Sequence, residues 1–530
     1  MVSVVREVKV AAGVFAPGHL GELTACLPFE LVDDVLEQTG AVQRRLRLLP
    51  SRAGVYFVLA LGMFPRLGYA RVWGKLITGL AGIDVPCPSE KALRDLRRRL
   101  GPAPLRALFE VVAGPLAPPQ APGVSWRGLR TVAFDGCSSL RVPDTARNRA
   151  WLGRIRHKAG FAGYPLLHLM GLAETGTRGL LGAAIGAAAD GDEPALARHL
   201  LHLLGAGMLV LIDRAYDQGA FLAEVAATGA HFLVRGKASR SPVVLARLPD
   251  GSYLSRAGDL SVRIVEATVQ AAGADGSSTG ESYRLITTLT DHRCFPATSL
   301  IRLYHERWEI ETAYCALRHT LLRGRVLRSG DRPGIEQEAW ALLTSYQLLR
   351  MAITDAVLTR PGADPDRASF TTALQAATDT ITAATGVCPA PASLTATSRA
   401  VLATLQPPRR PRYSARQVKS HRSRYPARNG TRPATPTKIT AIHITIHTPP
   451  PGPHNRRPPN RNRQKPRPGT HRDHVQTLMN TTPGQPWTSR DLATRLSLQP
   501  AIMLSHLAHW AATGLITRTA PATCTLNTPP

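Results

Sequence analysis

The hydrophobic pattern changes near residue 129, where helical spacing gives way to short apolar runs. LRTVAFDG (129–136) predicts a strand that ends at Asp135, and AGMLVLIDRAY (206–216) predicts an apolar strand that terminates in Asp213. The segments between them predict two strands and then an amphipathic helix: YPLLHLMGLAE, TRGLLGAAIGAAA and DEPALARHLLHLL. This β-β-β-α-β order predicts an α/β domain in which two strands each deliver an aspartate.

The rest of the chain divides around this domain. Residues 18–113 have helical spacing, 231–290 contain five short strand patterns joined by Gly, Asp and Ser turns, and 297–322 and 333–360 return to helix. We therefore predict four parts: a helical N-terminal domain over 1–115, an α/β domain over 125–360 with a β insertion at about 231–290, a basic Pro/Arg-rich and partly disordered linker over 385–471, and a winged helix-turn-helix-like module over 472–526. The linker contains one strand-like segment, KITAIHITIHT, which is expected to join the edge of an earlier sheet.

The net charge of +28 indicates a polyanionic partner. Residues 409–467 hold 16 Lys or Arg and no Asp or Glu. We expect this tract to follow the DNA backbone with salt-dependent affinity, although a solvated linker is the alternative. No amphipathic apolar face accompanies the tract, so no membrane partner is expected.

The cysteines and the apolar segments exclude two other classes of protein. The seven cysteines are scattered and have no zinc-ligand spacing, which favours reduced thiols. The most apolar stretch, LLHLLGAGMLVLI, contains His202 and is too short to span a bilayer, and MVSVVREVKV lacks a signal-peptide core. We therefore expect a soluble cytoplasmic protein.

One stretch near residue 310, YHERWEIETAYCALRHTLLRGR, concentrates charged and phenolic side chains on one helix face. On a continuous α-helix four of them fall within an arc of about 60°: Tyr304, Arg307, Glu311 and Arg318. Glu306 and Glu309 point elsewhere. One carboxylate between two guanidiniums and a phenol can help to bind a divalent metal ion and phosphates, as a nuclease or strand-transfer site requires.

Phosphodiester chemistry of this kind needs two or three carboxylates from different elements, and Asp135, Asp213 and Glu311 meet that need. The alternatives are ordinary structural roles: a strand-end Asp is often a turn or cap residue, and Glu311 has Arg307 at i−4 for a helix ion pair. Other acids compete for the same roles, with the last of them the first substitute for Asp213: Asp144, Asp190, Asp192 and Asp217.

The spacing Tyr-x2-Arg-x3-Glu-x6-basic, with Trp308 after the Arg and Ile310 before the Glu, resembles the signature of IS4-family transposases. FDGCSSLRVPDT is similar to the first-aspartate block of that family, and LIDRAYDQGAFL is similar to its second. The resemblance covers roughly residues 18–350. It implies a helical N-terminal transposase domain and an RNase H-like catalytic core with a β-rich insertion.

The resemblance also implies an activity. Asp135, Asp213 and Glu311 would be the catalytic DDE triad that binds two Mg²⁺ ions, or Mn²⁺, for cleavage of insertion-sequence ends and strand transfer. The DNA-binding side chains would be Tyr304, Arg307 and Arg318. The partners would be double-stranded terminal inverted repeats and target DNA, held by a homodimer on paired ends.

Three features depart from the family pattern. Arg318 stands where the family usually has Lys, and Tyr216 follows the second aspartate where Phe is common. The inserted strands lack a Trp, so the aromatic candidates for stacking on a displaced base are Tyr253, Tyr283 and Phe232.

Three other functions stay open on the sequence alone. The first is a catalytically inactive, transposase-derived DNA-binding protein, which the intact carboxylate set disfavours. The second is an RNase H-like nuclease without strand transfer. The third is a winged-helix regulator with a ligand-binding N-terminal half, for which no pocket motif is present. Within 472–526, His506 and His509 are the candidates for base contacts.

Overall fold

The computed structural model describes most of the chain between residues 18 and 526. It leaves undescribed residues 1–17, 46–47, 81–83, 155, 158–159, 162, 238–239, 274–275, 277, 386–393, 409–438, 450–470, 483–484, 496–502, 504–505, 509, 512–515, 521–522 and 527–530. The predicted role of the basic tract falls largely on these residues and stays a prediction. The chain forms two compact units, 1–450 and 451–530.

The N-terminal part of the first unit is helical. Its helices are α1 (Phe29–Gln38), α2 (Ser51–Met63), α3 (Tyr69–Ile77), α4 (Glu90–Leu100) and α5 (Ala103–Val112). Helix α4 begins where the Ser89 side chain accepts a hydrogen bond from the Ala92 amide, and it ends at Gly101, whose φ of 67° suits glycine. Almost every residue of α2 is buried, so this apolar helix forms the centre of the group.

In the described part of the first unit, eleven strands form one mixed sheet. Its main path has the order β6-β5-β2-β7-β8-β12-β11-β10-β9, while β1 (Ser125–Trp126) pairs with β2, and β13 pairs with β11. The central run consists of β2 (Leu129–Arg141), β5 (Leu166–Glu174), β6 (Leu180–Gly186), β7 (Met208–Ile212) and β8 (His231–Arg235). Strand β2 is antiparallel to β5 and parallel to β7, and β7 is parallel to β8. With α7 (Glu193–Arg198) before β7, the strands of the central run and this helix follow the predicted β-β-β-α-β order. The prediction missed α6 (Ala146–Leu152) and the short strands β3 (Arg156–His157) and β4 (Gly160–Phe161), which lie between β2 and β5 in the chain.

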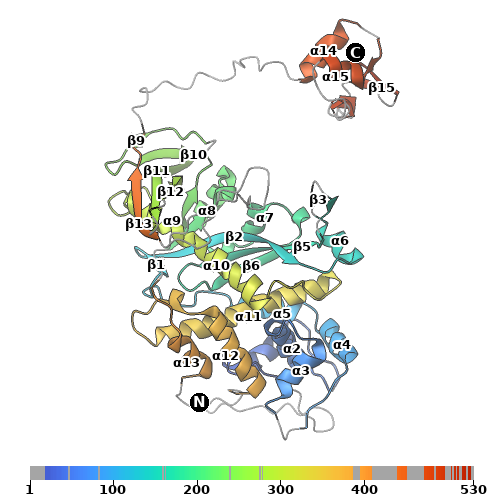
Figure 1. Cartoon of the computed structure of the whole chain (residues 1–530), viewed down its shortest axis with the longest axis vertical. Coiled ribbons are helices and arrows are strands. Elements are labelled where there is room, and N and C mark those ends of the chain that lie inside the picture. The colour runs from blue at the N-terminus through green and yellow to red at the C-terminus, as the bar shows by residue number, and fades with distance from the viewer. Residues whose placement is uncertain are drawn as a thin grey trace. The chain divides into compact units, whose positions relative to one another are not determined.

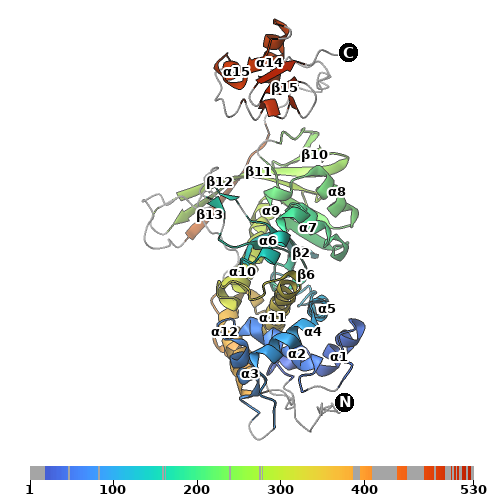
Figure 2. The same cartoon turned by 90° about the vertical axis from the view of Figure 1, so that its right-hand side faces the viewer.

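Helices cover both faces of this central run, as Figures 1 and 2 show. On one face Val132, Phe134 and Val210 share a core with residues of α7 and α8 (Gly219–Ala227). On the other face the alternate residues, such as Ala133 and Leu211, share a core with the helices that follow the insertion. The alternation of strand side chains therefore assigns odd-numbered positions of β2 and β7 to the second face.

Strand β2 does not end at Asp135, which corrects the sequence-based prediction. It continues to Arg141, with an irregularity in its pairing between Cys137 and Leu140. The reason is that β5 remains a hydrogen-bonded neighbour along this length, whereas the parallel pairing with β7 stops at Ala133. Asp135 thus lies inside a strand and just beyond the end of its neighbour β7.

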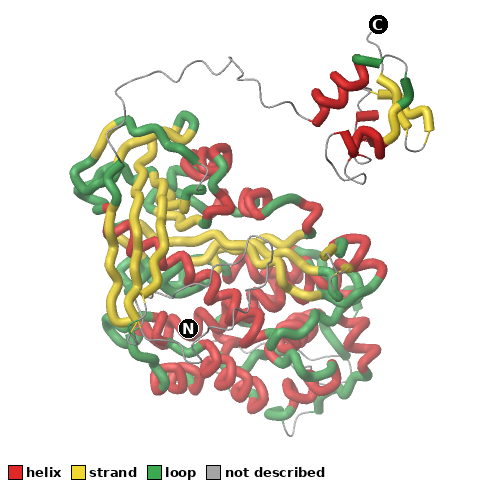
Figure 3. Tube along the Cα trace, turned by 45° about the horizontal axis from the view of Figure 1, so that its top comes forward, coloured by secondary structure: helices red, strands yellow, loops and turns green. Residues whose placement is uncertain are grey.

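The inserted strands form the far part of the sheet, and the two longest of them, β11 and β12, are among the long yellow strands beside the central run in Figure 3. They are β9 (Ala246–Arg247), β10 (Tyr253–Ala257), β11 (Leu260–Gly273) and β12 (Ser278–Thr287). The strand predicted at the start of this block, β8, instead pairs with β7 in the central run. Strand β13 (Ile439–Ile446) pairs antiparallel with the second half of β11, so the predicted edge strand is confirmed.

The helix predicted over 297–322 is not a continuous α-helix. Helix α9 (Ala297–Tyr304) is followed by a 3₁₀ turn, then α10 (Trp308–Cys315), then a π-helical segment over Ala316–Leu321. Each change of winding alters the angle between side chains, so the arc calculated for a regular helix does not hold across the whole stretch. The next predicted helix is confirmed as α11 (Arg332–Leu358), and α12 (Phe370–Ala383) and α13 (Ala396–Ala403) pack beside it.

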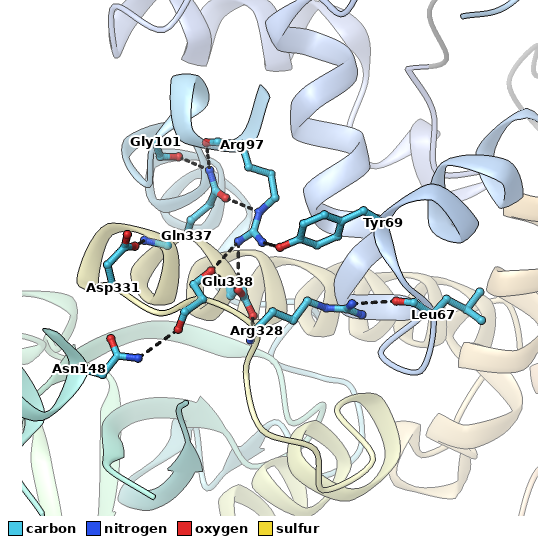
Figure 4. Close-up of polar contacts among 11 residues, drawn as sticks. Leu67, Tyr69, Arg97, Gly101, Asn148, Arg328, Asp331, Gln337 and Glu338 are labelled. Carbon is cyan, nitrogen blue, oxygen red and sulfur yellow. Dashed lines mark hydrogen bonds and ion pairs between the residues drawn. The ribbon is translucent and has the colours of Figure 1, made fainter. Parts of the chain in front are cut away.

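A buried polar network joins the N-terminal helices to α11 (Figure 4). The Arg97 guanidinium of α4 donates hydrogen bonds to Gln337 and Glu338 of α11 and to Ser329. Arg328 donates to the carbonyl oxygen of Leu67 at 2.7 Å. Because Arg97 and Glu338 are almost fully buried, the network fixes how the N-terminal helices sit on the α/β domain.

The second unit contains α14 (His471–Asn480), β14 (Trp487–Thr488), α15 (Ser489–Arg495), β15 (Ile516–Ala520) and β16 (Thr523–Leu526). The strands described in this unit form a sheet with the order β14-β16-β15. The helix predicted over 499–513 lies partly outside the described residues, and the described positions within 503–511 are helical. Trp487 and Trp510 are buried in the small core of this unit, as predicted. In the described part of the chain no helix is long and apolar enough to cross a membrane.

Candidate active site

Strand pairing places the two predicted aspartates at equivalent positions. The last paired residues of the parallel strands β2 and β7 are Ala133 and Leu211, and each is followed two residues later by an aspartate, Asp135 and Asp213. Asp213 keeps an extended backbone, with φ −77° and ψ 164°. Both aspartates therefore continue the odd-numbered alternation and belong to the face of the sheet that α10 covers.

Each aspartate also has a local backbone contact. Asp135 Oδ1 accepts a hydrogen bond from the Gly136 amide at 3.0 Å, and Asp213 Oδ1 accepts one from the Arg214 amide at 2.7 Å. Asp213 is therefore the cap of a short 3₁₀ turn, which is the structural role considered from the sequence. A carboxylate has a second oxygen, so these contacts leave both side chains able to bind a further partner.

The turn before α10 and the helix itself supply the third carboxylate. Arg307 Nη2 donates to Glu311 Oε1 at 3.0 Å, so the ordinary i,i+4 ion pair considered from the sequence is formed. The Arg307 side chain is only 2% exposed, whereas that of Glu311 is 31% exposed. The guanidinium is thus a fixed, buried cation, and the carboxylate reaches toward solvent.

Two tyrosines attach this helical stretch to the strands that carry the aspartates. The Tyr304 hydroxyl donates to the carbonyl oxygen of Ile212, the residue before Asp213, at 3.0 Å. The Tyr314 hydroxyl donates to the carbonyl oxygen of Asp135 itself at 2.6 Å. Glu311 lies between the two tyrosines in the sequence, so hydrogen bonds to β7 and β2 fix its backbone relative to both aspartates.

A glycine makes the second of these contacts possible. Gly171 of β5 is the direct strand partner of Asp135, and a Cβ atom there would lie 2.7 Å from the Tyr314 hydroxyl oxygen. A side chain at Gly171 would therefore push Tyr314 away from β2. The role of this glycine is to leave room, since its backbone does not have a positive φ.

We expect Tyr314→Phe to lower strand cleavage by roughly 10-fold while the protein stays folded, because one buried hydrogen bond is worth only about 1 kcal/mol in stability. The lost contact would loosen the position of Glu311 relative to Asp135. Cleavage rates and melting temperatures measured together would check this. Tyr164→Phe, at an exposed tyrosine, is the matched control, and equal cleavage by both variants would contradict the positioning role.

The electrostatics of the site couple its acidic side chains. Burial raises the pKa of Asp135 to about 7; Arg307 opposes this shift, and the carboxylates of Glu311, Glu193 and Asp213 add to it. The pKa of Arg307 is raised despite its burial, because tyrosine and carboxylate neighbours stabilise its charge. The site is therefore crowded with negative charge around one buried guanidinium.

The residues present fit a hard divalent cation by their chemistry. Asp135, Asp213 and Glu311 offer carboxylate oxygens, the donors that Mg²⁺ and Mn²⁺ prefer. Among the described residues, no three metal-ligating side chains are already gathered around one point. The Glu311 carboxylate is held by Arg307, so a cation at the aspartates would compete with that guanidinium for it.

The raised pKa of Asp135 gives folding stability a pH dependence. In the folded protein the pKa is about 7 and the ordinary value is 3.8, so Asp135 retains a proton that the unfolded chain releases between these values. This group therefore lowers the free energy of unfolding as the pH rises through that window, and its effect is constant above it.

We expect a divalent cation to displace that proton. Titration calorimetry of Mn²⁺ binding in two buffers of different ionisation enthalpy should show proton release at pH 6 that disappears near pH 8.5. Asp135→Asn should remove the release at pH 6. The same proton release at both pH values would show that another group is responsible.

Most of the competing acids have structural partners. Asp217 is buried and paired with Arg240, so it is a poor substitute for Asp213. Glu309 points away from the site, as predicted, and pairs with the buried Arg178. The remaining candidates bind surface arginines, a backbone amide and a helix start: Asp144 with Arg149 and Arg154, Asp190 with the Ala187 amide, and Asp192 as the cap of α7.

The predicted DNA-contacting side chains differ in exposure. Tyr304 and Arg307 are buried, whereas Arg318 is half-buried, with Nη1 3.9 Å from the Cys137 sulfur of β2. Of the three, Arg318 is therefore the most accessible to a DNA phosphate. A direct role in DNA binding stays a prediction for all of them.

The aromatic side chains proposed for base stacking are enclosed by the fold. All three candidates of the first unit are buried: Tyr253, Tyr283 and Phe232. In the second unit His506 stacks on Trp510, and His509 lies outside the described residues. Stacking on a displaced base by these residues stays a prediction.

Sequence reasoning missed two side chains at this site. Tyr314 could have been found, because it lies three residues after Glu311 and thus on a neighbouring part of the same helix face. Glu193, whose carboxylate lies against β2 next to Asp135, carried no such signal.

Comparison with known proteins defines the class. The chain matches the transposase DDE domain over residues 126–348 and the N-terminal domain of insertion element 4 transposases over residues 17–110. It is therefore a DDE transposase, an enzyme that acts on DNA, and such enzymes use divalent metal ions. More specifically, the chain belongs to the IS4 family.

Two individual proteins illustrate the relationship. The chain is 27% identical over 358 residues to the transposase InsG for insertion sequence element IS4 of Escherichia coli (strain K12), a match that covers 64% of this chain and 78% of InsG. A solved structure of the piggyBac transposase synaptic complex with hairpin DNA aligns with 75% of this chain and 88% of its own, at 9% identity and a TM-score of 0.37. The second likeness is too distant to support an inference.

Proposed function

We propose that this DNA transposase cleaves the ends of its insertion sequence and joins the freed 3′ ends to target DNA, with Asp135, Asp213 and Glu311 as the catalytic carboxylates. The observation that carries the proposal is the alignment of Asp135 and Asp213 beyond the paired ends of β2 and β7, on the face covered by the helix of Glu311. The negative charge of Glu311 contributes to the raised pKa of Asp135, which supports placing these two carboxylates in one site.

The three carboxylates would hold divalent metal ions, Mg²⁺ or Mn²⁺, which when bound activate a hydroxyl nucleophile and stabilise charge on the phosphate. The side chains of the protein position these groups. Tyr304 and Tyr314 hold the Glu311 helix on β7 and β2, and Arg307 supplies a fixed positive charge beside the carboxylates.

A second guanidinium would bind the substrate. Arg318 lies over Cys137, which is two residues after Asp135 in β2. A guanidinium at this place would contact a phosphate near the scissile bond, and its two edges suit bidentate contacts with phosphate oxygens.

We further infer that the core is RNase H-like and that 472–526 is a winged-helix module. The strand order β6-β5-β2-β7-β8, with two antiparallel neighbours and then two parallel ones, supports the first assignment. The helix and strand order of the second unit and its sheet order β14-β16-β15 support the other. The remaining boundaries we propose are 1–115 for the N-terminal domain, 125–360 for the catalytic domain and 385–471 for the linker, within which α13 and β13 pack against the rest of the first unit. The DNA partners would be terminal inverted repeats and target DNA, bound by a homodimer on paired ends.

A joining assay tests the proposal. The protein would be incubated with Mg²⁺ and duplexes that carry the inverted repeats flanking its reading frame, either intact or already nicked at the 3′ end of the element. Cleavage of the intact duplex together with joining of the nicked one to a plasmid is the expected result. Cleavage without joining would indicate a nuclease, and neither reaction would indicate an inactive DNA-binding protein.

A further inference from the structure

Glu193 brings a fourth carboxylate to the edge of the proposed site from the opposite face of the sheet. Its carboxyl carbon and one carboxyl oxygen both lie 2.7 Å from the position that a Cβ atom on Gly136 would occupy. Gly136 directly follows Asp135 in β2. The absence of a side chain at this position therefore lets the Glu193 carboxylate lie against the β2 backbone.

The local structure holds Glu193 in this place. It is the first residue of α7, where the Asp192 side chain accepts a hydrogen bond from the Ala195 amide and Pro194 limits the backbone. Gly136 has no positive φ, so glycine is needed here for space rather than for backbone conformation. The first residue of α7, Glu193, therefore packs directly against the β2 backbone at Gly136.

The end of β7 gives Glu193 access to the site. Strand β7 pairs with β2 only as far as Ala133, so this parallel neighbour does not flank β2 at Asp135 and Gly136. The Glu193 carboxylate is thus one residue away from Asp135 along β2, on the α7 side. Its charge acts on Asp135 together with those of the other two proposed ligands.

A second observation, at the buried guanidinium of Arg307, indicates that the site binds an anionic ligand. Arg307 is 2% exposed, yet within the described part of the chain its Nε and Nη1 atoms have no hydrogen-bond acceptor. Its Nη2 atom donates to the Glu311 carboxylate, its guanidinium carbon lies 4.8 Å from the centroid of the Trp308 ring, and the Tyr304 hydroxyl is a further polar neighbour. An anionic group entering the site, such as a DNA phosphate, would supply the missing acceptors, and the surplus of carboxylates suits a cation bound beside that phosphate.

We propose that Glu193 is a positioning carboxylate of the metal site, which raises the affinity of Asp135 and Asp213 for a divalent cation and depends on glycine at position 136 for its approach. This inference rests on the proposed function. Glu193 adds negative charge behind the metal ligands, and it has no step of its own in the reaction.

The test measures Mn²⁺ binding to the full chain without DNA, by titration calorimetry. Glu193→Gln should weaken Mn²⁺ binding by roughly 10-fold, since groups that support metal ligands contribute roughly 10- to 100-fold to metal affinity. Glu193→Asp, which keeps the charge, should recover part of that loss. The matched control is Glu224→Gln on the exposed surface of α8, which should leave the affinity unchanged.

A variant at Gly136 tests whether metal binding depends on the Glu193 carboxylate lying against the β2 backbone. Gly136→Ala should displace the Glu193 carboxylate and weaken Mn²⁺ binding to a similar degree, whereas Gly205→Ala, at a position with open space, should have no effect. Melting temperatures without metal show whether each variant is folded. Unchanged Mn²⁺ affinity in a folded Glu193→Gln or Gly136→Ala protein would overturn this inference alone. Failure of the unmodified protein to bind Mn²⁺ would count against the proposed function as well.

Discussion

Asp135→Asn is expected to reduce Mg²⁺-dependent strand cleavage by on the order of 10³-fold or more, because catalytic groups that act as a unit fail together when one is lost. Asp213→Asn and Glu311→Gln should have similar effects, and double variants should be little worse than single ones. Cleavage of duplexes that carry the inverted repeats, followed on denaturing gels, measures the loss.

The same substitution should not destabilise the metal-free protein. At pH 8 the ionised Asp135 is disfavoured by burial and by other carboxylates, so a neutral amide of the same shape removes an unfavourable charge. We expect the free energy of unfolding to stay the same or rise. Asp144→Asn, which changes a carboxylate paired with surface arginines, is the control and should keep cleavage activity. Retained cleavage in Asp135→Asn would show that the triad is assigned wrongly.

Arg178→Met is expected to cost about 3–5 kcal/mol of folding stability, the range for removing one partner of a buried ion pair. Arg178 lies between β5 and β6 and pairs with both Glu309 of α10 and Asp366. All three side chains are at most 4% exposed, so the substitution would leave two carboxylates buried without their cation. Denaturant titrations of variant and unmodified protein would measure the difference.

The effect should extend to catalysis, because Glu309 is two residues from Glu311 in the same short helix. Variants that remain folded at low temperature should therefore cleave DNA more slowly. Arg198→Met breaks a surface pair with Glu224 whose members are 40% and 39% exposed, and should change stability by less than about 1 kcal/mol. A loss for Arg178→Met as small as for this control would contradict a structural role for the buried triad.

Local sequence patterns were sufficient to predict part of the fold. Apolar runs identified β2, β5, β6 and β7 in order. Asp135 and Asp213 were predicted as site residues because each is an acidic residue directly after such a run. Helix-ending signals were equally local, as at Ser89 and Gly101 of α4. These predictions needed no knowledge of which strands are neighbours.

The features that could not be predicted depend on contacts between distant residues. Strand β2 continues past Asp135 because β5 pairs with it there, and the bare backbone of Gly136 matters because Glu193 lies against it. The 3₁₀ and π segments on either side of α10 likewise have no local marker such as proline. Tyr304 was assigned to DNA from its place in a motif, whereas its hydrogen bond to Ile212 depends on tertiary packing against β7.

The pairing of β13 with β11 has a consequence for synthesis of the protein. One edge of β11 pairs with β12, so β10 and β13 share the other, and β13 is translated long after the part of β11 that it covers. Until β13 leaves the ribosome, the backbone amides and carbonyls along that stretch of β11 are unpaired and can form hydrogen bonds with a strand of another chain. A truncated gene that ends after the catalytic domain would therefore encode an aggregation-prone polypeptide.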